Sequence, residues 1–329
     1  MPGASEKVSR RTRAIRMAGT LAGRVLGKYR LIEKIGSGAM ADVYRAIQIG
    51  LDRDVAVKVL APALAHDRVM IGRFRHASQS TARLSHPNVI TIFDSGETDG
   101  LAYYAMEYLR SRTLEDRIAD EPALPMSRAI KIAGDVLKAL AYAHERGVVH
   151  GGLTTASVKF DSRDNAVVTG WARAGAELDM SADIRAAGAV LYALITGLEL
   201  APGAKPLLAH LADATQEDLI GLVENALTAP ALFTSAREML LKLKNIELGL
   251  RARAISRAID RVPVALVASD PSGPCLRESD DSWDVLSSLS AIITHEEERR
   301  AVARAFSWAA PLFLFGLVGV GWLVRTFYR

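Results

Sequence analysis

Two glycines and a lysine near the start of the chain have the types and spacing of a phosphate-binding site. Gly36 and Gly38 lie in "IGSGAMADVYRA", and Lys58 follows Gly38 by 20 residues, inside "VAVK". Glycines permit a tight hairpin whose backbone N–H groups can approach phosphate oxygens, and a nearby lysine adds a positive charge. The alternatives are an ordinary hairpin turn and an exposed strand lysine.

The hydrophobic pattern shows which elements must position these residues. From Tyr29 to about Tyr104, short β-rich runs alternate with turns and predict strands: "YRLIEKI", "ADVYRAIQ", "DVAVKVL", "VITIFDSG" and "LAYYAMEYL". A helical period marks "RVMIGRFRHASQSTARLS" between the third and fourth runs. From about Thr113 the pattern is mostly helical, with "PMSRAIKIAGDVLKALAYAHERG", "SADIRAAGAVLYALITG", "QEDLIGLVENALTA" and "SAREMLLKLKNIEL". The predicted fold class is α+β, with a β-rich small lobe followed by a helical large lobe.

Composition limits the alternatives. The chain has 329 residues, of which 50% are hydrophobic and 24% are charged, as in a globular protein. The single cysteine, Cys275, excludes an intramolecular disulfide and a cysteine-based zinc site. Eight lysines and arginines face one acid in residues 1–30. This basic leader is either a solvated, flexible segment or an arm attracted to anionic lipid or to an acidic partner. No nucleic-acid partner is expected.

The C-terminal region predicts a membrane anchor. Residues 305–324, "AFSWAAPLFLFGLVGVGWLV", contain no charge. At about 1.5 Å per residue they would cross roughly 30 Å, the thickness of a bilayer's hydrocarbon core. Trp308 and Trp322 lie near the two ends, where interfacial aromatic residues belong. No secretory signal follows the basic start, so we expect a single-pass protein whose larger part faces the cytoplasm.

The predicted organisation has five parts. They are a basic leader (1–28), a folded domain (29–248), a juxtamembrane linker with helical pieces (249–304), a transmembrane helix (305–324) and a short tail (325–329).

Five motifs in order give this domain a recognisable character. "IGSGAMADVYRA", "DVAVKVL", "HPNVITIFDSG", "AMEYL" and "VVHGGLTTAS" resemble the bacterial eukaryotic-like serine/threonine protein kinases over roughly Tyr29 to Ile246. The resemblance implies a bilobal kinase-like fold. It also implies that Lys58 is the strand lysine that contacts the α- and β-phosphates, and that Asp183 holds the catalytic loop through backbone hydrogen bonds.

The resemblance further implies a nucleotide slot. Its implied members are the glycines and lysine above, a gatekeeper, two hinge residues and apolar roof residues: Ile35, Gly36, Gly38, Val43, Ala56, Lys58, Met106, Glu107 and Leu109. Lys159 falls where the family has an apolar residue under the adenine, which argues against binding, although a cation–π contact is an alternative. ATP without magnesium is the cofactor that this set could take.

The catalytic loop departs from the family pattern. The triplet that supplies the catalytic base in active kinases is here His150, Gly151 and Gly152, so no carboxylate stands at the base position. The loop lysine and the metal-binding asparagine correspond to Thr154 and Ser157.

The other catalytic positions depart as well. The Asp-Phe-Gly motif corresponds to "GWA", residues 170–172, and the helix glutamate corresponds to Ala77, with no carboxylate between residues 69 and 84. Ten residues separate Ala172 from Asp183, where active kinases carry an activation segment of several dozen residues. The sequence predicts a kinase fold without phosphoryl transfer and without metal ligands.

Three functions remain open. The first is a membrane-anchored pseudokinase that acts as a scaffold or adaptor in signalling and recruits a cytoplasmic protein. The second is a nucleotide-binding sensor. The third is a kinase with relocated carboxylates, for which Asp161, Asp164 and Glu177 are the candidates; their alternative role is that of turn and surface acids.

Overall fold

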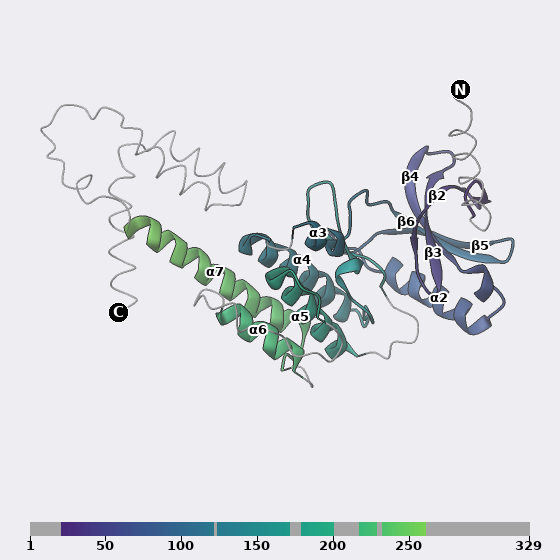
Figure 1. Ribbon diagram of the computed structural model, residues 1–329. Coiled ribbons are helices and arrows are strands. Elements are labelled where there is room, and N and C mark those ends of the chain that lie inside the picture. The colour runs from purple at the N-terminus through teal and green to yellow at the C-terminus, as the bar shows by residue number, and fades with distance from the viewer. Residues whose placement is uncertain (1–20, 122–123, 172–178, 201–216, 229–231, 261–329) are drawn as a thin grey trace, which may run out of the picture. The chain divides into compact units, whose positions relative to one another are not determined.

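The computed structural model describes residues 21–121, 124–171, 179–200, 217–228 and 232–260 (Figure 1). The chain divides into two compact units, Met1–Ile246 and Glu247–Arg329. The first unit contains a six-stranded sheet followed by helices, as the sequence predicts. In the second unit the described residues are 247–260, which form the end of helix α7.

The sheet is antiparallel throughout. Its strands lie in the order β1 (Val25–Leu26), β2 (Tyr29–Ser37), β3 (Ala41–Gln48), β4 (Arg53–Leu60), β6 (Leu101–Glu107) and β5 (Ile92–Thr98). The five predicted strands are all present. Strand β1 lies before Tyr29, the predicted start of the domain. It was not predicted, because two residues are too few to show an alternating pattern.

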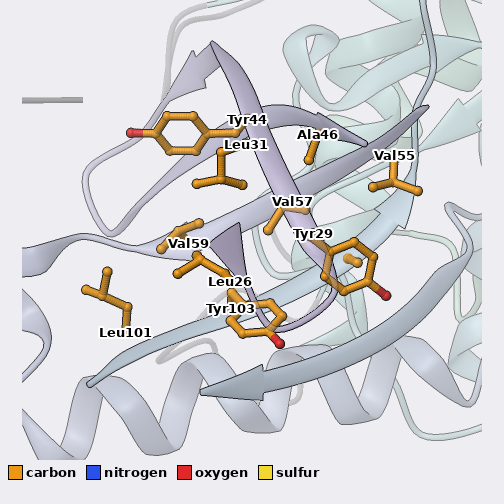
Figure 2. Close-up of a cluster of buried hydrophobic side chains, with 11 residues drawn as sticks. Leu26, Tyr29, Leu31, Tyr44, Ala46, Val55, Val57, Val59, Leu101 and Tyr103 are labelled. Atoms are coloured by element: carbon orange, nitrogen blue, oxygen red, sulfur yellow. The ribbon is translucent and has the colours of Figure 1, made fainter. Parts of the chain in front are cut away.

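One face of this sheet holds the larger apolar cluster, shown in Figure 2. Alternate residues of β4, namely Val55, Val57 and Val59, lie in this cluster together with Tyr29 and Tyr103. Side chains alternate between the faces of a strand, so Ala56, Lys58 and Leu60 belong to the opposite face. Burial of each apolar side chain contributes about 1.5–3 kcal/mol relative to exposure.

Helix α2 (Arg68–Ala82) packs on that opposite face, beside β5 and β6 (Figure 1). Its first turn is capped by Asp67, whose carboxylate accepts hydrogen bonds from the backbone N–H groups of Val69 and Met70. Phe74 of α2 lies against Tyr104 of β6, with ring centroids 5.1 Å apart. These two residues belong to the second apolar cluster of the sheet.

The helical part of the domain follows. Its elements are α3 (Leu114–Asp120), α4 (Met126–His144), the 3-10 turn η2 (Thr155–Ser157), strands β7 (Val158–Phe160) and β8 (Ala166–Val168), α5 (Met180–Thr196), α6 (Glu217–Leu227) and α7 (Ala236–Asp260). Helix α5 packs against both α4 and α6. A Cβ at Gly188 of α5 would lie 2.7 Å from the Cβ of Ala226 in α6, so glycine permits this close approach.

Two features differ from or extend the sequence-based picture. Helix α7 is continuous through residue 248, so the predicted domain boundary falls inside a helix, and the basic piece "RARAISRAID" is part of α7. None of the helices in the described ranges is long and apolar enough to cross a bilayer. The predicted anchor at 305–324 and the leader up to residue 20 lie outside the described residues.

Candidate nucleotide site

The sheet brings the glycine-rich hairpin and Lys58 together in one row. Gly36 of β2 is paired with Val43 of β3, Val43 with Lys58 of β4, and Lys58 with Tyr104 of β6. The N–H of Gly38 donates to the carbonyl of Ala41 over 3.0 Å and closes the hairpin. The predicted phosphate-binding residues are therefore neighbours across three adjacent strands.

The predicted roof residues, the gatekeeper and Glu107 lie on strands β2, β3, β4 and β6, whereas the hinge residue Leu109 follows β6 and is buried. Ile35 is 40% exposed, whereas Ala56 is buried and paired with the predicted gatekeeper, Met106. The N–H of Glu107 donates to the carbonyl of Thr91 over 2.9 Å, so this amide already has an acceptor within the protein.

The Glu107 carboxylate is disfavoured by burial and by a nearby negative charge. Burial raises the pKa of the Glu107 carboxyl, and the charge of Asp161 raises it further. The carboxylate of Glu107 therefore makes its surroundings less favourable to an anionic ligand.

Lys58 of β4 lies beside an aromatic ring of the neighbouring strand β6. Its Nζ lies 5.8 Å from the centroid of the Tyr104 ring, and among the described residues no carboxylate is within 4.0 Å of it. Ala77 of α2, at the position of the helix glutamate, is buried. In the described part of the chain, the Lys58 ammonium therefore has the Tyr104 ring as a neighbour and no carboxylate partner.

Asp183 organises the loop at residues 150–152, which confirms its predicted structural role. Its carboxylate is 1% exposed and accepts hydrogen bonds from the N–H of His150 at 2.7 Å and the N–H of Gly151 at 2.9 Å. Nε2 of the buried His144 lies 2.9 Å from the same carboxylate. Burial alone would raise the pKa of Asp183, but these hydrogen bonds outweigh it and hold the pKa below its ordinary value.

Around this frame the loop is packed but carries no acid at the base position. The His150 ring lies 5.1 Å from the ring of buried Trp171, and its Nε2 is 2.8 Å from the carbonyl of Thr169. Gly151 and Gly152 have φ angles of 71° and 157°. Residues other than glycine rarely adopt such φ angles, so the backbone conformation disfavours an aspartate at residue 152.

One carboxylate near this loop was missed by the sequence analysis. Thr155 of η2 donates a hydrogen bond to Glu199, which follows α5. The two residues are 44 positions apart, and no motif or spacing in the sequence links them.

The two relocated-acid candidates that the structure describes, Asp164 and Asp161, form structural contacts. Asp164 forms ion pairs with Arg117, at 2.8 Å, and with Arg128. Asp161 accepts hydrogen bonds from the backbone of Arg163 and Asn165, as a turn acid does. Glu177 lies outside the described residues.

Lys159 turns toward the protein backbone. Its Nζ donates to the carbonyl of Ser111 over 3.3 Å, and the Ser111 hydroxyl in turn bonds the backbone of Phe160. Burial lowers the pKa of Lys159. This lysine therefore fastens β7 to the segment that follows the hinge. No group of three or more potential metal-ligating side chains occurs in the part of the chain that the structure describes.

Comparison with known proteins agrees with this geometry. Residues 29–169 match the family described as protein kinase domain. The serine/threonine-protein kinase PrkC of Bacillus subtilis is 38% identical over 146 residues, which make up 44% of this chain and 22% of PrkC. The serine/threonine-protein kinase PksC of Streptomyces coelicolor is 30% identical over 293 residues, which make up 77% of this chain and 52% of PksC.

A solved structure extends the likeness. The crystal structure of the PknI kinase domain of Mycobacterium tuberculosis superposes with a TM-score of 0.60 at 29% identity, covering 69% of this chain and 99% of that domain. The chain spans about a fifth to a half of the length of the two curated relatives above. Residues 29–169 are a protein kinase domain similar to those of bacterial serine/threonine-protein kinases, and the predicted bilobal kinase-like fold is confirmed.

Proposed function

We propose that this family member is a pseudokinase, a scaffold or adaptor that is anchored in the membrane and does not transfer phosphate. The observation that carries the proposal is the loop at residues 150–152. Asp183 holds this loop in place, yet the residue at the base position is Gly152, with a φ of 157°. The frame is kept while the side chain that would accept the substrate proton is absent.

The missing catalytic groups have a cumulative energetic effect. Loss of one transition-state-stabilising group costs an enzyme about 3 kcal/mol, or roughly a hundredfold in rate, and groups that act together fail together. Here the base, the metal ligand of the Asp-Phe-Gly motif and the helix glutamate are replaced by Gly152, Gly170 and Ala77. The acids Asp161 and Asp164 are held in turns and ion pairs.

Phosphoryl transfer tests the proposal. The purified full chain is incubated with γ-labelled ATP, magnesium or manganese and a generic protein acceptor, with the PrkC kinase as positive control. We expect no label on the acceptor or on the chain itself. Stoichiometric labelling would refute the proposal.

The anchor rests on residues 305–324 and is tested separately. We expect the full chain to stay with membranes at alkaline pH, and a variant with two arginines in place of Leu314 and Val318 to be released, because a charge near the centre of a span costs about 3 kcal/mol. Release of the unaltered chain would remove the membrane part of the proposal.

A nucleotide-binding sensor is the second candidate, favoured by the preserved row of Gly36, Val43 and Lys58. Because a ligand that binds the folded state stabilises it, ATP should raise the unfolding temperature of the full chain. The rise should persist in EDTA and disappear in Lys58→Ala. No rise at millimolar ATP would leave the scaffold as the sole function proposed.

A further inference from the structure

Helix α2 carries an excess of positive charge on its exposed surface. Four arginines and one histidine lie on or directly after it, and they are called the basic face: Arg68, Arg73, Arg75, His76 and Arg83. All five are exposed, and no aspartate or glutamate occurs between residues 69 and 84. Solvated helices ordinarily mix charges of both signs on such a face.

The arrangement follows from the helical period. Phe74, Ala77, Ser78 and Thr81 are buried on the side that meets the sheet. At about 100° per residue, Arg68, Arg75 and Arg83 fall on one stripe of the opposite side. At 1.5 Å per residue this stripe is about 22 Å long, which matches an extended peptide of about seven residues.

Helix stability does not explain these charges. Arg68 is at the N-terminal end, where the helix dipole disfavours a cation. Arg75 is the one arginine of the face with a carboxylate partner among the described residues, since it pairs with Glu97 at 2.5 Å. Arg68, Arg73 and Arg83 form no ion pair in those ranges. The face therefore presents several guanidinium groups to solvent.

We propose that the basic face of α2 is a docking site for an acidic segment, rich in aspartate and glutamate, of a protein partner. The proposal rests on the scaffold function and names the chemistry of the partner. Guanidinium groups pair with carboxylates through two parallel hydrogen bonds, and the Arg75–Glu97 pair shows one carboxylate already held by this face.

The same features disfavour a lipid surface as the ligand. A helix that binds a bilayer interface inserts its apolar side among the acyl chains. The apolar side of α2 packs on the sheet, and Val69, 60% exposed, is its one large hydrophobic side chain on the solvent side. An extended acidic peptide can bind the basic face without any apolar side chain of α2 being inserted into the ligand.

The probe is a fluorescein-labelled octapeptide of alternating aspartate and glutamate, with an asparagine–glutamine peptide of the same length as control. Binding to the full chain in non-ionic detergent is followed by fluorescence anisotropy. We expect the acidic peptide alone to bind, and binding to weaken with salt because exposed charges are screened.

The test variant is Arg68→Gln, Arg75→Gln and Arg83→Gln together. Its matched control makes the same change at three exposed arginines outside α2, namely Arg30, Arg110 and Arg163. From the strength of exposed ion pairs, the test variant should lose roughly tenfold in affinity, and the control should change little. Equal affinities for the two variants, or equal binding of the two peptides, would overturn the proposal.

A second variant keeps the test decisive if the triple variant does not fold. Glu97→Gln releases Arg75 for the ligand, so it should tighten peptide binding by roughly two- to threefold. Unchanged or weaker binding would count against the site. If soluble short-chain phosphatidylserine binds the basic face and the acidic peptide does not, the ligand is lipid and the proposal is wrong.

These outcomes are separable from those of the proposed function. Peptide binding does not depend on phosphate transfer, so a labelled acceptor together with arginine-dependent peptide binding would refute the pseudokinase proposal and keep the docking site. An unlabelled acceptor with no arginine-dependent peptide binding would keep the pseudokinase proposal and refute the docking site.

Discussion

Replacing Asp183 by alanine should destabilise the domain strongly, because its carboxylate holds the loop at residues 150–152. The carboxylate is buried and accepts hydrogen bonds from two backbone N–H groups, those of His150 and Gly151. A buried donor left without a partner costs about 1–3 kcal/mol, so two such donors give a loss of about 4 kcal/mol. This is a large part of the roughly 5–15 kcal/mol that stabilises a typical domain.

Trp171 provides the readout. It is buried, lies 5.1 Å from the His150 ring and therefore reports on the loop that Asp183 holds. With Trp283, Trp308 and Trp322 replaced by phenylalanine, urea unfolding is followed by the fluorescence of Trp171. Asp183→Ala should lower the free energy of unfolding by about 4 kcal/mol, which for a domain of this size corresponds to about 12 °C in unfolding temperature. Asp183→Asn keeps one acceptor oxygen and should lose about half as much free energy, near 2 kcal/mol.

The control is Asp52→Asn. Asp52 is exposed, with a φ of 46° that asparagine also tolerates, so its replacement should change the free energy of unfolding by less than about 0.5 kcal/mol. If Asp183→Ala were within about 1 kcal/mol of the unaltered chain, the hydrogen bonds to the loop would not be stabilising the fold, and the reasoning would be refuted.

The fall in the free energy of unfolding at acid pH should also depend on Asp183. The pKa of Asp183 is lower in the folded chain than its ordinary value of 3.8. The unfolded chain therefore binds this proton at a higher pH than the folded chain does. Stability from this group is complete above the ordinary pKa and is lost as pH falls through the folded pKa. Asp183→Asn should flatten that decline, and an unchanged acid limb would contradict the assignment.

Three further variants test other parts of the account. Gly152→Asp restores an acid at the base position but places a side chain on a residue with a φ of 157°. It should lower the free energy of unfolding in urea by about 1–3 kcal/mol and give no labelled acceptor. A gain in labelling would contradict the proposal. Gly188→Val places atoms against Ala226 and should destabilise by about 2 kcal/mol, whereas Gly134→Ala, a helix site with open space around it, should not destabilise; equal effects would refute the packing argument. Burial lowers the pKa of Lys159, so the free energy of unfolding should rise with pH until the ordinary lysine pKa of 10.5 is reached. Lys159→Met should remove this rise in urea unfolding at alkaline pH. A rise that persists in the variant would point to another group.

Much of the fold was predictable because its elements are long enough to show a period. Strand β3 (Ala41–Gln48) and helix α4 (Met126–His144) each match a run identified by its pattern. The short strands β1 (Val25–Leu26) and β7 (Val158–Phe160) could not be found, because two or three residues show no alternation.

The sequence could propose the positions of the candidate site but could not predict the contacts that their side chains make. The resemblance of a local motif to the kinase pattern implied that Asp183 holds the loop, and the structure shows these hydrogen bonds. The contact of Glu199 with Thr155 depends on the tertiary path of the chain, so no local pattern predicts it. The direction of Lys159 depends on the carbonyl of Ser111, 48 positions away, for the same reason.

Glu199 also defines the most direct test of the central claim, which is that no carboxylate serves as the catalytic base. The full chain, Lys58→Ala and Glu199→Gln are compared for transfer of labelled phosphate from ATP under single-turnover conditions, with magnesium and with manganese. All three proteins should give the same background transfer, because Glu199 is a hydrogen-bond acceptor for Thr155. Transfer by the unaltered chain that is lost in Glu199→Gln would show a relocated base and contradict the account.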